Sequence, residues 1–112
     1  NILKIIKNIQ VSKKLWTRYW EMLEVVLSNQ FKKDLKLASK RGYKLELLEK
    51  TVDKIANNIK LEDKYRDHAL TGNYIGFREC HIQPDWLLVY RIENDELILF
   101  LSRTGSHSDL FN

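Results

Sequence analysis

The chain of 112 residues is 44% hydrophobic and 30% charged, so it has the size of one domain and too much apolar content to remain disordered. Its single cysteine, Cys80, excludes an intrachain disulfide and favours a reducing, cytoplasmic compartment. No apolar run approaches the roughly 20 residues that span a bilayer, and residues 1–10 lack the cleavage site of a signal peptide. Composition therefore argues against a membrane protein and a secreted one.

The net charge of +4 comes from residues 1–21, which carry five bases and one acid, while the remainder holds 14 of each. The apolar positions of this segment fit a basic amphipathic helix with a break near Val11 and Ser12. We interpret residues 1–21 as an extension, artificial or from upstream sequence, and Met22 as the native start of a domain over residues 22–112. The helix either packs without further function or binds a partner or RNA. Its apolar residues are Ile2, Ile5, Ile6, Ile9, Trp16, Tyr19 and Trp20.

A strand and two helices are predicted next. The segment "MLEVVL" is a short apolar strand. A helix then starts at Ser28 or Asn29, both good N-caps, and ends at Gly42. A second helix has an apolar stripe at helical spacing, and all of its members are expected in the core: Leu45, Leu48, Val52, Ile55 and Ile59.

The second half of the chain predicts three strands. A polar loop, "KLEDKYRDHALTGNY", precedes the strands "GFRECHI", "WLLVYRI" and "ELILFLSR", which are joined at Pro84 and at Asn94-Asp95. The tail "TGSHSDLFN" ends the chain. The order β-α-α-β-β-β plus a short C-terminal tail predicts an α+β fold. A small antiparallel sheet would have two N-terminal helices packed on one face and an open second face.

Polar side chains gather near the strand ends. Strand alternation places Glu79 and His81 on one face and Cys80 on the other, so Cys80 and His81 cannot share a metal ion. No other metal-ligand spacing is present, and no metal site is expected. The loop, the first of the three strands and the tail each contribute one histidine, and all three segments can reach the rim of an open sheet face. Each histidine alone reads as a surface residue, and Trp86 at a strand start reads as core; together they suggest a shared site.

Two long stretches, "DHALTGNYIGFRECHIQPDWLLVY" and "LILFLSRTGSHSDLF", resemble the YafQ type of the RelE/ParE toxin superfamily. The resemblance extends over about residues 22 to 111 and includes a DHxL-x-G stretch, an HxxPDW corner and an RTGSH segment. It implies a RelE-like fold and ribosome-dependent cleavage of mRNA without a metal, a membrane or a small-molecule cofactor. It also implies a cognate antitoxin as partner. The site residues implied by the resemblance are His68, His81, Asp85, Trp86, Arg103, His107 and Phe111.

Metal-independent cleavage of RNA uses its own 2′-hydroxyl, and it needs a base, an acid and a cation beside the phosphate. Histidine suits both proton transfers. We assign His107 as the acid, Asp85 or His81 as the base, and His68 as a phosphate or proton-transfer partner. Arg103 would clamp the phosphate.

The remaining members of the expected site would contact RNA without taking part in proton transfer. Trp86 and Phe111 would stack on or orient an unpaired base. Three lysines of the first domain helix either grip ribosomal RNA or form a solvated face: Lys32, Lys33 and Lys36.

Two other functions remain open on the sequence. A protein of the same fold could lack nuclease activity and inhibit another target, such as DNA gyrase, although the three histidines argue against that. A catalytically inactive protein could instead act by sequestration or co-repression with an antitoxin.

Overall fold

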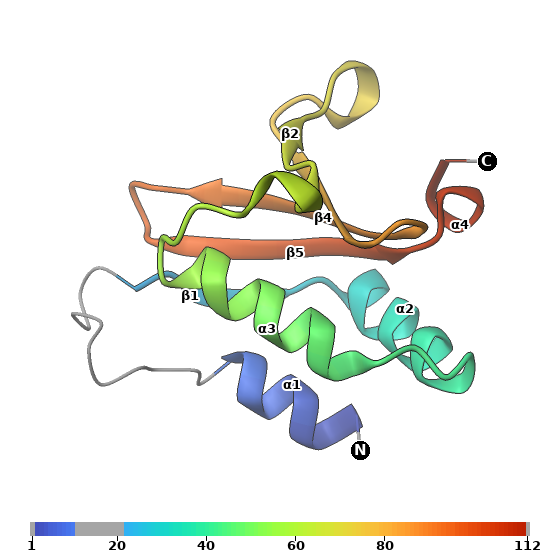
Figure 1. Ribbon diagram of the computed structural model, residues 1–112. Coiled ribbons are helices and arrows are strands. Elements are labelled where there is room, and N and C mark those ends of the chain that lie inside the picture. Colours follow the sequence, from blue (N-terminus) through green and yellow to red (C-terminus); the bar gives the residue numbers. More distant parts are fainter. Residues whose placement is uncertain (1, 11–21, 112) are drawn as a thin grey trace.

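The computed structural model describes residues 2–10 and 22–111 (Figure 1). The helices are α1 (Ile2–Gln10), α2 (Asn29–Lys40), α3 (Leu45–Ala56) and α4 (His107–Phe111). The strands are β1 (Glu24–Leu27), β2 (His68–Ala69), β3 (Arg78–Gln83), β4 (Trp86–Glu93) and β5 (Ile98–Gly105). The 3₁₀ turns η2 (Asp63–Tyr65) and η3 (Gly72–Tyr74) lie on either side of β2 in the chain. Among these helices none is both long and apolar enough to cross a bilayer.

The strands form one sheet in the order β1-β5-β4-β3-β2, which confirms the predicted α+β fold. Two details differ from the prediction. The first strand pairs parallel to β5, because the long connection between them imposes no hairpin. The loop expected before the third strand contributes β2, whose two residues pair antiparallel with β3.

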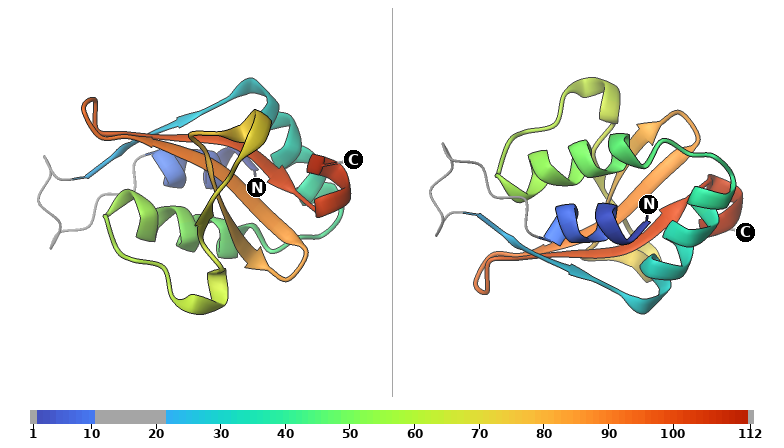
Figure 2. Two further views of the ribbon diagram at one scale, coloured as in Figure 1. Left: turned by 90° about the horizontal axis from the view of Figure 1, so that it is seen from above. Right: turned by 90° about the horizontal axis from the view of Figure 1, so that it is seen from below.

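Helices α1, α2 and α3 lie on the same side of the sheet (Figures 1 and 2). Ser28 caps α2 by accepting a hydrogen bond from the backbone N–H of Phe31 at 2.9 Å. Gly42 follows the end of α2 with a φ of 77°, a conformation that glycine adopts without steric cost. Fully buried residues of α2, α3 and the sheet then form the main core, including Phe31, Leu35, Leu48, Val52, Leu88 and Leu99.

The prediction that Ile59 belongs to this core is wrong. The second predicted helix, α3, ends at Ala56, and Asn58 takes a left-handed conformation with a φ of 59°. The side chain of Ile59 is therefore turned away from the stripe and is 48% exposed.

Helix α1 adds a third helix to this layer. It contacts α3, α2 and β1, and its Ile9 is 1% exposed within the main core. The break predicted at Val11 and Ser12, and the aromatic residues at positions 16, 19 and 20, lie outside the described residues.

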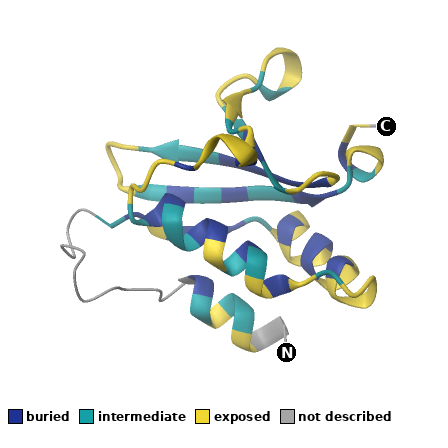
Figure 3. Ribbon diagram, in the orientation of Figure 1, coloured by how far each residue is buried: buried dark blue, intermediate teal, exposed yellow. Residues whose placement is uncertain are grey.

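The second face of the sheet is only partly open, which corrects the prediction. Leu87 and Val89 of β4 are buried there beneath Leu110 of α4, and Tyr74 and Phe77 pack against them. Figure 3 shows exposed residues on β2, on the segment after it and on part of α4. The C-terminal tail therefore folds back over the sheet and brings its polar residues to the end of β3 and β4.

Candidate active site

The corner between β3 and β4 places two polar side chains on the partly open face. Glu79 and His81 pair with Val89 and Leu87, so all four side chains point to that face. The register shifts between His81 and Gln83, a bulge of the kind that re-aims side chains near functional sites. The His81 ring is held by an Nδ1 hydrogen bond, 3.3 Å long, to the backbone carbonyl of Pro84.

Asp85, which ends this corner, binds the first residue of α4. Its Oδ1 accepts hydrogen bonds from the backbone N–H of His107 at 3.0 Å and from ring Nδ1 at 2.9 Å. The backbone bond, followed by the bond from the imidazole, lowers the pKa of Asp85 below its ordinary value. This carboxylate is thus held ionised beside His107, whose Nε2 is the ring nitrogen that Asp85 does not contact.

His81 and His107 lie next to each other, with ring centroids 5.7 Å apart. Ligand atoms of Glu79, His81 and His107 all lie within 4.8 Å of one another. Two imidazoles and a carboxylate are also a donor set that zinc or copper accepts. The expectation of no metal site rested on the opposite faces of Cys80 and His81 and on the lack of any other metal-ligand spacing. Cys80 does lie buried on the helix side, where burial raises the pKa of its thiol. That expectation did not consider Glu79 as a ligand, and it stays a prediction.

Glu79 is a site residue that sequence reasoning missed. It is 6% exposed, and its Oε2 lies 3.1 Å from Nε2 of His68 on β2. No described group donates a hydrogen bond to its Oε1, which is unusual for a buried carboxylate. The signal was present, because a charged residue alternates with His81 on the same strand face.

His68 joins the cluster through Glu79. Its Nδ1 lies 2.6 Å from the carbonyl oxygen of Arg66, so both ring nitrogens face acceptors. The ring thus bridges the Glu79 carboxylate and the backbone of Arg66. The structure thus brings together His68, Glu79, His81, Asp85 and His107.

Arg103 is held differently. Its Nε and one terminal nitrogen donate to the carboxylate of Asp34 on α2, at 2.8 and 3.2 Å, and this pair raises the pKa of Arg103. The backbone N–H of Thr104 also donates to Asp34, at 3.1 Å. A register shift between Val89 and Tyr90 pairs Arg103 with Val89, which turns it to the partly open face. Its guanidinium is therefore committed to Asp34, and it is 26% exposed.

The two expected base-stacking residues have different surroundings. Phe111 is 41% exposed, with its ring 6.5 Å from that of His107 and 5.5 Å from that of Tyr74, so its ring is accessible. Trp86 is 2% exposed on the helix side, where its Nε1 donates to Oγ1 of Thr104 at 2.8 Å. Stacking of Trp86 on a base is therefore inconsistent with its burial; Trp86 anchors the corner that carries Asp85.

Asp109 fixes α4 in place, a role that the sequence did not indicate. Its carboxylate accepts hydrogen bonds from Arg41 at 2.6 Å and from the backbone N–H of Ser106 at 3.1 Å. The Arg41 bond first and the Ser106 bond second lower the pKa of Asp109 to about 2. A Cβ at Gly105 would lie 3.1 Å from this carboxylate, so a side chain there would require Asp109 to shift by a few tenths of an ångström.

The three lysines of α2 that were expected to contact RNA are exposed: Lys32, Lys33 and Lys36. They lie apart from the histidine cluster in the chain and on a different element.

A small α+β protein with imidazoles and carboxylates clustered at a sheet end has a site suited to proton transfer. The model of the family described as "Bacterial toxin of type II toxin-antitoxin system, YafQ" matches residues 23–112, so the chain belongs to this family. Helix α1 lies outside the matched range.

Individual relatives agree with the family. The chain is 39% identical over 89 residues to the mRNA interferase toxin YafQ of Escherichia coli K12, with 79% of this chain and 95% of that protein covered. A metal-bound toxin from Helicobacter pylori is a similar solved structure, with 51% identity, a TM-score of 0.76, and 80% of this chain and 100% of the other covered. The E. coli DinJ-YafQ toxin-antitoxin complex gives 37% identity and a TM-score of 0.74, with 81% and 99% covered. The chain is thus a toxin of a type II toxin–antitoxin system.

Proposed function

We propose that this toxin is an endoribonuclease that cuts mRNA and so inhibits translation. The observation that carries the proposal is the cluster in which Glu79, His81 and His107 offer atoms within 4.8 Å of one another, with Asp85 bound to His107. The E. coli relative is named an mRNA interferase, which supports the same activity here.

The reaction that suits these groups is attack of the RNA 2′-hydroxyl on the adjacent phosphorus. A base removes the 2′ proton, the new O2′–P bond forms, and the P–O5′ bond breaks. An acid protonates the departing 5′ oxygen, so the products are a cyclic phosphate and a free 5′-hydroxyl. Two neighbouring imidazoles can supply both proton transfers, each typically worth about 10²- to 10⁴-fold in rate.

The contacts of Asp85 favour His107 as the general acid. A carboxylate on Nδ1 stabilises the imidazolium and leaves Nε2–H for the 5′ oxygen. Asp85 accepts two hydrogen bonds from His107, so it positions the acid and is poorly placed to act as the base. His81 is then the base, with Nδ1 held by Pro84 and Nε2 left to accept the 2′ proton.

The remaining groups would orient the cluster or bind the substrate. Glu79 and His68 form a pair that orients the cluster from β2 and β3. Phe111 would stack on a base beside His107. Arg103 would stabilise the phosphate with the exposed part of its guanidinium while Asp34 holds the rest.

The ribosome would present the message, because the domain after residue 21 has no net positive charge with which to attract free RNA. The exposed lysines of α2 would grip ribosomal RNA. Replacing Lys32, Lys33 and Lys36 with glutamine should make the slope of ribosome affinity against salt shallower by up to about 3, roughly one for each phosphate that is no longer neutralised. A slope equal to that of the wild type would leave these lysines as a solvated helix face.

The antitoxin complex formed by the E. coli relative supports a cognate antitoxin for this toxin. We place the protein in the bacterial cytoplasm, where ribosomes are found. We assign the activity to residues 22–112, so a chain that starts at Met22 should still arrest growth, although it loses the packing of Ile9 in the main core.

An in-vitro translation reaction with primer extension of the message tests the proposal. The toxin should produce discrete cuts within codons, and added antitoxin should suppress them. The alternative, an inactive protein that acts by sequestration or co-repression, predicts an intact message. Intact message with translation arrested would contradict the nuclease and support that alternative.

A further inference from the structure

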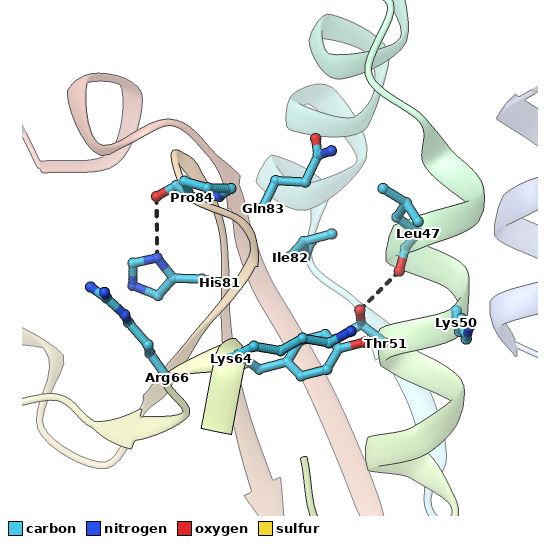
Figure 4. Close-up of a pocket in the computed structure, with 10 residues that line it drawn as sticks. Leu47, Lys50, Thr51, Lys64, Arg66, His81, Ile82, Gln83 and Pro84 are labelled. Atoms are coloured by element: carbon cyan, nitrogen blue, oxygen red, sulfur yellow. Dashed lines mark hydrogen bonds between the residues drawn. The ribbon is translucent and has the colours of Figure 1, made fainter. Parts of the chain in front are cut away.

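A cavity of about 600 Å³ lies beside the cluster, between α3, η2 and the β3–β4 corner (Figure 4). This volume is in the range of small-ligand pockets and is large enough for one nucleotide. In Figure 4, Leu47 and Thr51 project from α3 on one side, and His81 and Pro84 stand on the other. Of its lining residues, the proposed proton transfers use His81 and none of the others.

The walls of the cavity are chemically mixed. Leu47, Ile82 and Pro84 supply apolar surface. Gln83 contributes an amide, which both donates and accepts hydrogen bonds. A planar base with polar edges suits this combination, because its faces need apolar contact and its edges need hydrogen bonds.

The charged side chains that line the cavity are basic. Lys50, Lys64 and Arg66 line it, and none of its described lining residues is acidic. The nearby Glu62 is engaged by Lys54, whose Nζ lies 3.2 Å from its carboxylate. An anionic ligand would therefore meet cations without a competing carboxylate in the wall.

The cavity shares a wall with the active site. His81 belongs to both, and its Nδ1 is held by the carbonyl of Pro84, another lining residue. Arg66 also belongs to both, because its carbonyl oxygen lies 2.6 Å from Nδ1 of His68. A ligand in the cavity would thus lie directly beside the phosphate on which His81 acts.

We propose that this cavity is the subsite for one unpaired mRNA nucleotide next to the scissile phosphate, and that it sets the base preference of cleavage. The base would insert between Leu47 and Ile82 with its edge at Gln83, and its phosphate would face Lys64 and Arg66. This inference rests on the proposed nuclease function. An acidic segment of an antitoxin could also pair with the basic side chains of the cavity. It would not explain why the cavity adjoins the active site through His81 and through Arg66, which contacts His68.

The test uses the full chain and synthetic messages programmed into ribosomes. One message is unmodified, and two others have an abasic nucleotide directly 5′ or 3′ of the cut. The wild type should cut one of the abasic messages about 10-fold more slowly than the unmodified message, as expected from the loss of one stacked base.

Leu47→Trp fills the cavity from α3, and Ile59→Trp is the matched control at an exposed position. Leu47→Trp should cut the unmodified message about 10-fold more slowly and show no further loss on the sensitive abasic message. Ile59→Trp should behave as the wild type. Lys50→Glu, an exposed change, should reproduce the loss if Leu47→Trp does not fold, with Lys44→Glu as its control.

Several results would overturn the subsite. The first is that the wild type cuts all three messages at the same rate. The second is that Leu47→Trp and Lys50→Glu both keep full activity. The third is that the fold-loss in cutting rate caused by Leu47→Trp and the fold-loss caused by the abasic nucleotide multiply when the two are combined. Normal cutting by Leu47→Trp combined with lost antitoxin binding would assign the cavity to the antitoxin instead. If the wild type cuts no message at all, the proposed function itself fails, and the subsite fails with it.

Discussion

Asp34 and Asp85 each bind a basic side chain of the candidate site, but their surroundings differ. The Asp34 side chain is 8% exposed and its partner Arg103 26%, whereas Asp85 is 69% exposed and His107 56%. A buried pair is weakly screened and costly to break, so the first pair joins α2 to β5 as part of the fold. An exposed pair contributes little to stability, so the second can gain and lose a proton during a reaction without unfolding the site.

The largest expected effect is on the exposed pair. His107→Ala should lower the rate of message cleavage by about 10²- to 10⁴-fold, because it removes the general acid. Primer extension gives the rate of cleavage. Urea unfolding should show that His107→Ala is as stable as the wild type. A folded His107→Ala variant that cuts at the parental rate would remove His107 from the mechanism.

The next effect is on the buried pair. Asp34→Ala should lower the free energy of unfolding by about 3 kcal/mol, because Arg103 and the backbone N–H of Thr104 lose their acceptor. Urea unfolding measures this, with Asp95→Ala in the exposed β4–β5 connection as control. If both variants lose equally little stability, the distinction between the two pairs is wrong.

Asp85→Asn should have a smaller effect than His107→Ala. The amide oxygen can still accept from the backbone of His107, but the charge that stabilises the imidazolium is lost, so cleavage should fall about 10-fold. Stability should match that of Asp95→Asn. A large loss of stability in Asp85→Asn alone would show that this pair, too, belongs to the fold.

The smallest effect is a dependence of stability on pH at Asp109. Its folded pKa, about 2, lies below the ordinary 3.8, so its contribution is complete above about pH 4 and is lost as pH falls towards 2. Asp109→Asn should therefore be less stable than the wild type at neutral pH, and the difference should shrink through that window. A difference that stays constant from about pH 5 to pH 2 would contradict the anchoring of α4 by this carboxylate.

The fold was largely predictable because its signals are local. Gly42 marked the end of α2, Ser28 its start, and strand-like runs between turn residues marked the three long strands. The parallel pairing of β1 with β5 was missed because it joins segments with no local link. The two residues of β2 lie in a polar stretch that carries no strand pattern.

The parts of the candidate site that follow from the alternation of side chains along one strand were predictable. The parts that depend on contacts between residues distant in the sequence were not. Alternation put Glu79 and His81 on one face, as the structure has them. The face of Arg103 depends on a bulge, and its pairing with Asp34 joins residues 69 positions apart. Sequence could not decide whether Trp86 faces solvent or core, since either side of the sheet suits a strand start; the contact with Thr104 decides for the core.

The central claim is that the clustered imidazoles use the 2′-hydroxyl of the message to break it. The most direct measurement compares a ribosome-bound message with one in which the nucleotide before the cut has hydrogen in place of the 2′-hydroxyl. The account predicts a cyclic phosphate and a free 5′-hydroxyl from the first message and no cut in the second. A cut in the deoxy-substituted message, or a 5′-phosphate on the product of the first, would contradict it.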